Sequence, residues 1–146
     1  MDFPTNSSIG DYMTHTNKQF LQELNVAIVD SLLSLSDYLN SGMISLCAEV
    51  DKEYDAFDTN IKIECKGGIE DNDMFINMNI IDLGGKGHYN LTSYSLDIRT
   101  SDSEDGGFGE VIRKEVNRLL NKERTVPDYA VEALNSGYSC LKASNP

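Results

Sequence analysis

The chain has few of the residue types that catalytic and metal-binding motifs need. Its 146 residues include no tryptophan, two histidines and three cysteines. It has no Cys-x-x-Cys pair, no Gly-x-Ser-x-Gly and no His-Glu-x-x-His, so it matches none of the common redox, hydrolase or zinc-protease motifs. His15 and His88 are far apart, and neither has a Cys or His at ligand spacing. We therefore expect no catalytic site, no metal and no cofactor.

The three cysteines, Cys47, Cys65 and Cys140, are odd in number and widely spaced. This pattern favours free thiols in a reducing compartment over a disulfide framework, and predicts a cytoplasmic protein. The first residues have no basic segment followed by an apolar one, so we expect no secretion signal. The most apolar segment, residues 20–39, contains several acids, which argue against a membrane span.

Basic residues are also scarce. There are 12 lysines and arginines against 24 acids, and the formal net charge is −12 at pH 7. Such a molecule repels nucleic acid and anionic lipid and attracts basic surfaces. We therefore expect a basic protein as partner, with no direct binding to nucleic acid or membrane.

The pattern of apolar residues predicts a helix first. Thr16 and Gln19 form a capping-box pattern, and Gly42 is a typical helix stop. Between them, the apolar face of residues 20–39 is broader than an ordinary amphipathic stripe. This helix is therefore expected to be deeply buried or shared with a second chain. Residues 1–15 are expected to be a flexible N-terminal arm, and residues 16–146 a single α+β domain.

Four segments then alternate apolar and polar residues with a period of two, which predicts half-buried strands of an antiparallel sheet. The segments are residues 43–50, 60–66, 74–80 and 90–100. Their connectors, residues 55–59, 67–73 and 83–87, contain turn-forming residues. A meander is the simplest topology for four strands joined in this way.

Two more helices are expected near the C-terminus. The first begins near Phe108 and has bases on its outer faces, namely Arg113, Lys114, Arg118 and Lys122. A shorter helix follows Pro127 and is expected to stop at Gly137. The predicted fold is therefore α+β: a four-stranded antiparallel meander with a long N-terminal helix and two C-terminal helices packed on one face.

A glycine cluster before the helix at Phe108 has the form of a phosphate-binding loop. Its members are Gly106, Gly107 and Gly109. However, the acids Asp102, Glu104 and Asp105 stand just ahead of it, where they complement the helix dipole themselves. We interpret this stretch as an acidic loop capping a helix.

Most of the acids lie between Ser41 and Glu110, so the negative charge gathers on the predicted sheet and its turns. Carboxylates spaced along strands can stand in for successive phosphates and dock on a basic groove. Aromatic residues among them, including Phe75, would act as anchors. The predicted partner-binding residues are Asp51, Glu53, Tyr54, Asp55, Phe57, Asp58, Glu70, Asp71, Asp73, Asp102, Glu104 and Asp105.

The sequence thus predicts a non-enzymatic acidic protein that inhibits or sequesters a basic, nucleic-acid-handling partner. In size and charge alone it resembles phage-encoded DNA mimics, anti-restriction and anti-CRISPR proteins, and toxin-immunity proteins. One alternative is an oligomeric structural subunit or acidic chaperone that uses residues 20–39 as its interface. Another is a small enzyme with a composite site on the polar sheet face, built from Cys47 or Cys65 with His88, or from paired acids such as Glu49 and Glu64.

Overall fold

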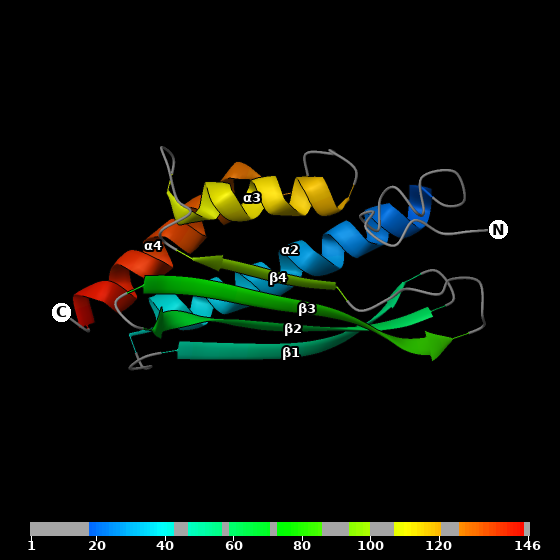
Figure 1. Ribbon diagram of the computed structural model, residues 1–146, viewed down its shortest axis with the longest axis horizontal. Helices are drawn as coiled ribbons and strands as arrows, with labels where there is room; N and C mark the ends of the chain where they lie inside the picture. The colour runs from blue at the N-terminus through cyan, green and yellow to red at the C-terminus, as the bar shows by residue number, and fades with distance from the viewer. Residues whose placement is uncertain are drawn as a thin grey trace.

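In the part of the chain that the structure describes, one sheet and three helices form an α+β arrangement (Figure 1). The computed structural model describes residues 18–42, 47–56, 59–70, 73–85, 94–99, 107–120 and 126–144. The expected N-terminal arm and the capping residue Thr16 lie outside these ranges.

The four strands form one antiparallel sheet in the order β1-β2-β3-β4, as the predicted meander requires. Their bounds are Cys47–Ala56 for β1, Thr59–Glu70 for β2, Asp73–Gly85 for β3 and Tyr94–Arg99 for β4. The first three strands extend beyond the expected segments into residues that we had assigned to turns. In particular, β1 continues through the acidic stretch from Asp51 to Ala56.

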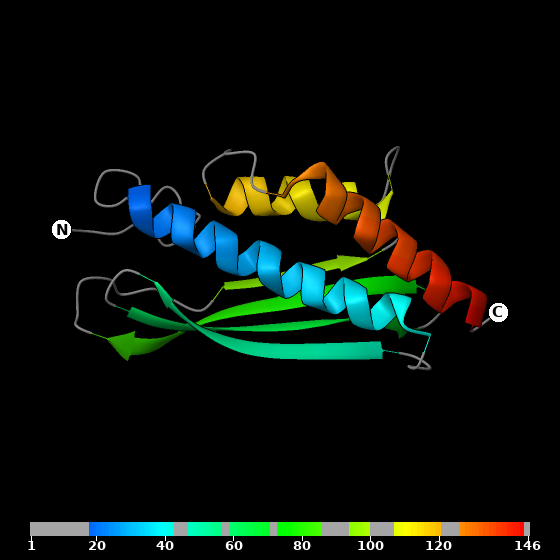
Figure 2. The same cartoon turned by 180° about the vertical axis from the view of Figure 1, so that it is seen from behind.

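All three helices lie on one face of the sheet, which confirms the predicted layering (Figure 2). They are α2 from Lys18 to Asn40, α3 from Phe108 to Leu119 and α4 from Asp128 to Ser144. Gly42 follows α2 with a φ of 72°, a conformation that glycine adopts without strain at a helix end. None of these helices is long and apolar enough to cross a membrane.

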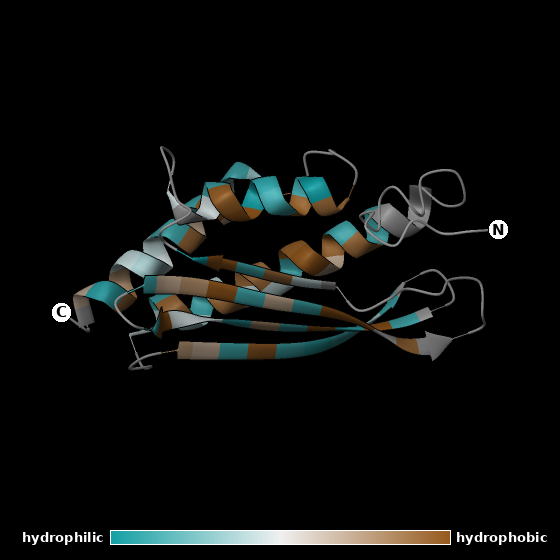
Figure 3. Ribbon diagram, viewed as in Figure 1, coloured by the Kyte–Doolittle hydropathy of each residue, from teal (hydrophilic) through white to brown (hydrophobic). Residues whose placement is uncertain are grey.

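The core lies between this helical layer and the sheet. The inward side chains of the strands and the apolar faces of the helices meet there. The hydropathy colouring shows apolar and polar residues in turn along the strands (Figure 3). Ile61, Ile63 and Cys65 of β2 are fully buried, as the alternation predicted. Burying apolar surface of this kind contributes about 25 cal/mol per Å² and is the main driving force for the fold.

The broad apolar face of α2 is covered within the chain, by the sheet on one side and α4 on the other. A Cβ at Gly137 would lie 2.8 Å from the Leu39 Cβ, so glycine lets the two helices approach closely. The prediction that the last helix stops at Gly137 is therefore wrong, because α4 continues to Ser144. Of the described residues on the broad face, Val26 remains exposed and Leu33 half-buried.

Gly67 is a second place where close packing requires glycine. A Cβ there would lie 2.7 Å from the Tyr138 hydroxyl oxygen and 3.0 Å from Leu35. That hydroxyl is buried and donates a hydrogen bond to the Phe75 carbonyl oxygen. The expected turn at residues 67–73 is thus wrong in its first part, because residues 67–70 continue β2 beneath α4.

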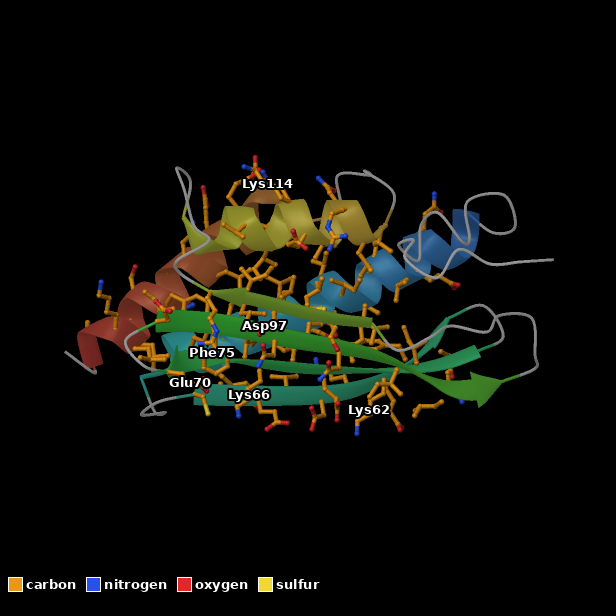
Figure 4. The ribbon with its side chains drawn as sticks, in the orientation of Figure 1. Lys62, Lys66, Glu70, Phe75, Asp97 and Lys114 are labelled. Carbon is orange, nitrogen blue, oxygen red and sulfur yellow. The ribbon has the colours of Figure 1, made fainter. Side chains whose placement is uncertain are left out.

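Arg113 does not lie on an outer face of α3, as we had expected, but is 5% exposed. Its Nε donates to the Val126 carbonyl oxygen at 2.7 Å, and its remaining nitrogens pair with Glu110 and Asp128. A buried guanidinium requires this many acceptors. It therefore ties α3 to the start of α4, whereas the neighbouring Lys114 points away from the sheet into solvent (Figure 4).

Candidate partner-binding surface

No described helix packs on the other face of the sheet, which we call the uncovered face (Figure 1, Figure 2). Directly opposed residues of antiparallel strands point to the same side, so the strand register gives its composition. Charged residues contribute most of it. They are Glu49, Asp51, Glu53 and Asp55 of β1, Lys62, Glu64, Lys66 and Glu70 of β2, Asp73 of β3, and Asp97 and Arg99 of β4.

The strongest negative charge on this face follows β1. Glu49, Asp51, Glu53 and Asp55 occupy successive alternate positions and are all exposed; we call them the β1 acid row. Among the described residues, none of the four carboxylates forms an ion pair. Alternate residues of a strand are about 6.8 Å apart, since each advances about 3.4 Å. The β1 acid row is therefore a regular line of exposed carboxylates at the edge of the sheet, with Lys66 opposite Glu49 and Lys62 opposite Glu53 on β2.

The neighbouring strand β2 alternates in sign. Its row on this face is Lys66, Glu64 and Lys62, and both lysines lie on the side of the sheet away from the helices (Figure 4). Lys62 pairs with Glu64 on its own strand at 3.4 Å. In the register, Asp51 lies directly opposite Glu64. Glu49 and Glu64 lie on adjacent strands of the uncovered face, as expected, but the acid directly opposite Glu64 is Asp51, two residues from Glu49.

Further across the sheet the surface becomes largely neutral. Asn77 and Asn79 occupy the centre of β3, and Ser95 of β4 donates a hydrogen bond to Asn79 Oδ1 at 2.6 Å. Asp97 lies opposite Asn77. The negative charge is thus unevenly distributed, with its densest line at the β1 edge.

The end of the sheet at Glu70 is organised around Arg99. Its guanidinium carbon lies 5.6 Å from the centre of the Phe75 ring, and its Nη2 is 3.1 Å from Glu70 Oε1. Such cation–π contacts contribute about 0.5–1 kcal/mol at exposed sites. Phe75 is only 3% exposed, which contradicts its expected role as a surface anchor. Glu70 and Phe75 are therefore engaged with Arg99, while Asp73 lies opposite Glu70 in the register.

Tyr54 does not join the acids on the uncovered face. It points toward α2, where its hydroxyl donates to Asp30 Oδ2 at 2.8 Å and shares a hydrogen bond with the Ser31 hydroxyl at 2.9 Å. Burial raises the pKa of Tyr54 to about 12, and the hydrogen bond from Tyr54 holds the pKa of Asp30 below its usual value. Lys52 joins this group through contacts with Asp30 and Ser34. Tyr54 and Lys52 thus fasten β1 to α2.

The other predicted partner-binding residues lie outside the described parts of the chain. They are Phe57, Asp58, Asp71, Asp102, Glu104 and Asp105. Gly107 and Gly109 of the glycine cluster are described. The Gly109 amide donates to Asn135 Oδ1 at 2.7 Å, and a Cβ at Gly109 would lie 2.5 Å from the Val131 carbonyl oxygen. The short distance to Val131 shows that α3 packs on α4 too closely for a side chain at position 109, which explains the glycine there.

A groove of about 470 Å³ runs beside β1, between this strand and α2. On the helix side it is lined by Ser34, Asp37 and Tyr38, and on the strand side by residues 49–52. Tyr38 is 53% exposed. Asp37, Tyr38 and Glu49 are not among the partner-binding residues predicted from the sequence. For Glu49 the alternation with Asp51 and Glu53 was an available signal, whereas α2 and β1 meet only in the folded chain.

The two thiols considered for a composite enzyme site lie on opposite faces of the sheet. Burial raises the pKa of the Cys65 thiol to about 12, so this thiol stays protonated and unreactive. Cys47 lies on the other face of the sheet and is exposed, and His88 lies outside the described residues. In the described ranges, no three His, Cys, Asp or Glu side chains gather in a way that could hold a metal ion.

Comparison of the chain with protein-family models, with curated proteins and with solved structures finds no match.

Proposed function

We propose that this protein is a non-enzymatic acidic binding protein that inhibits or sequesters a basic, nucleic-acid-handling partner, in the manner of DNA mimics and of anti-restriction, anti-CRISPR or toxin-immunity proteins. The observation that carries the proposal is the β1 acid row. Its carboxylates are exposed, lie on one face of one strand and form no ion pair in the described part of the chain.

The β1 acid row suits a surface that normally grips nucleic acid. Its charges form a regular line with a repeat of about 6.8 Å, the distance of two strand residues, and duplex DNA also presents regular lines of negative charge. Lysines and arginines placed to contact a line of phosphates would meet a line of carboxylates in its place. Such contacts steer association and weaken as salt rises.

A purely solubilising surface is the competing explanation, because charged residues also protect sheet edges from aggregation. The opposition of Asp51 and Glu64 argues against it. Directly opposed like charges destabilise a sheet, and solubility does not require them to face each other. Departures from local stability rules of this kind are expected at functional sites.

Self-association is the second candidate function, and one observation favours it. Val26 is 66% exposed and Tyr129 is 61% exposed, and both line a groove of about 680 Å³ between α2 and the start of α4. Exposed apolar side chains around a groove are typical of interaction sites. A subunit or chaperone role would use this groove, because most of the described apolar face of α2 is covered within the chain.

The proposed compartment is the cytoplasm. Cys47 is exposed, Cys65 buried and Cys140 partly buried, and no disulfide joins these three described cysteines. An exposed thiol persists in a reducing environment. A cytoplasmic protein would also have direct access to nucleic-acid-handling partners.

The proposal is tested by capturing proteins from a cell lysate and releasing them with excess duplex DNA. Partners that use a nucleic-acid-binding groove are displaced by DNA, whereas other bound proteins remain. The test variant is Asp51→Asn with Glu53→Gln, and the matched control is Glu132→Lys, an exposed site on α4. Both variants change the net charge equally, so they differ only in where the charge is altered.

The expected result is that the control retains the DNA-displaceable proteins and the β1 variant loses them. Retention of the same proteins by both variants would show that the β1 acid row does not recognise them. Failure of duplex DNA to displace any captured protein would contradict the proposed nucleic-acid-handling partner.

A further inference from the structure

β1 is a long strand at the edge of the sheet. It spans 10 residues from Cys47 to Ala56 and pairs with β2 only. In an antiparallel pair every second residue directs its N–H and C=O away from the partner strand. Within the described residues, no backbone hydrogen bond is made by the outer edge of β1. Among the residues that the structure describes, a row of backbone donors and acceptors along this edge therefore faces no other strand, and it lies beside the groove of about 470 Å³.

Acidic side chains flank the β1 edge on both sides of the sheet. The β1 acid row lies on the uncovered face, and Asp37 lies on the helix side of the groove beside Tyr38. The cation nearest to this edge, Lys52, is turned toward α2 and occupied by Asp30 and Ser34. Edge strands that are only protected against pairing commonly carry lysines. The exposed charges beside this edge, those of the β1 acid row and Asp37, are negative and therefore favour a positively charged partner.

We propose that the basic partner contributes an extended segment, with lysine or arginine at alternate positions, that adds to the outer edge of β1 as a fifth strand. This inference rests on the proposed function and specifies how its partner binds. The backbone of the segment pairs with β1, a mode in which main-chain hydrogen bonds give affinity and alternate side chains give specificity. Its basic side chains lie beside Glu49, Asp51 and Glu53 on the uncovered face.

On the opposite side of the added strand, the intervening side chains enter the groove between β1 and α2. There they meet the ring of Tyr38 and the carboxylate of Asp37. An arginine at this point would stack on the tyrosine ring, whose face attracts cations. The proposed segment is therefore selected by both of its faces.

The test uses a short peptide of alternating arginine and valine and a second peptide of the same sequence in which every backbone nitrogen is methylated. Both carry the same charge and side chains, but the methylated peptide cannot donate backbone hydrogen bonds. Binding to the full chain is measured at low salt, and amide hydrogen exchange is followed for the β1 residues in the free and bound protein. Asp51→Asn is compared with Asp97→Asn, a change on the same face at the opposite edge strand.

The expected result is that methylation weakens binding by at least about tenfold, because several backbone hydrogen bonds are lost together. The outward amides of β1 become protected from exchange only with the unmethylated peptide. Asp51→Asn weakens binding of that peptide, and Asp97→Asn does not.

Equal binding of the two peptides, or binding without protection of β1 amides, would overturn the added strand while leaving acidic recognition of a basic partner intact. If neither peptide binds, the added strand is overturned, and the DNA-displacement experiment decides separately whether the proposed function survives.

Discussion

Asp51 on β1 and Glu64 on β2 lie directly opposite each other on the uncovered face of the sheet. Only Glu64 has an ion-pair partner within the described residues, namely Lys62 on its own strand. Two residues earlier on β1, Glu49 lies opposite Lys66. Asp51 thus faces an acid and Glu49 faces a base, so replacing each of them with lysine should have opposite effects on stability.

Reversing the charge of Asp51 should stabilise the fold. Asp51→Lys replaces a like-charge pair by an attractive one, and we expect the free energy of unfolding to rise by about 0.2–1 kcal/mol. Glu49→Lys should lower it by a similar amount, since it sets two lysines opposite each other. Urea denaturation measures both. Changes of the same sign for the two variants would contradict the register-based explanation.

Gly67→Ala should destabilise the protein, because the added Cβ would lie 2.7 Å from the Tyr138 hydroxyl oxygen. Overpacking of this kind costs about 1–3 kcal/mol. Tyr138→Phe removes that oxygen, so the double variant should lose less stability than the sum of the two single variants. Thermal unfolding of the three variants checks this, and strict additivity would mean that the two residues do not clash.

Arg113→Ala should be more damaging than a surface substitution. It would leave the part-buried Glu110 carboxylate and the buried Val126 carbonyl oxygen without their donor, a loss that costs about 1–3 kcal/mol. Arg113→Lys should recover only part of this, since an ammonium cannot serve the acceptors in the fork geometry of a guanidinium. Full recovery in denaturation experiments would show that charge alone matters at this position.

Stability should decrease under alkaline conditions. Burial raises the pKa of Cys65 from 9.0 to about 12, and that of Tyr54 from 10.0 to about 12. The unfolded chain therefore loses these protons at lower pH than the native state, and the free energy of unfolding falls as pH rises from about 9 toward 12. Cys65→Ala should make this decline shallower. An unchanged decline would show that the Cys65 thiol does not contribute.

The order of elements, the meander and the single helical layer could be predicted from the sequence because hydrophobic periodicity reports burial directly. The continuation of β1 through Asp51–Ala56 could not. Its inward residues there include Lys52 and Tyr54, which look polar but are satisfied by Asp30, Ser31 and Ser34 of α2. A polar residue with a distant tertiary partner breaks the apolar alternation that marks a strand.

Glycines caused the errors at element ends. Glycine is typical of turns and helix ends, yet Gly67 lies inside β2 and Gly137 inside α4. Tyr138 packs closely against Gly67, and Leu39 packs closely against Gly137. The burial of Phe75 also depends on a tertiary contact, because Arg99 on the adjacent strand packs over its ring. The candidate surface was found in part, because charge is visible in sequence, while the groove between α2 and β1 depends on the packing of the two elements.

The most direct test of the central claim is the salt dependence of affinity for one purified, DNA-displaceable partner. For the unaltered protein and for Glu132→Lys, we expect the logarithm of the binding constant to fall steeply and equally with the logarithm of salt concentration. For Asp51→Asn with Glu53→Gln, we expect weaker binding and a shallower slope. Equal affinity and equal slope for all three proteins would contradict recognition through the β1 acid row.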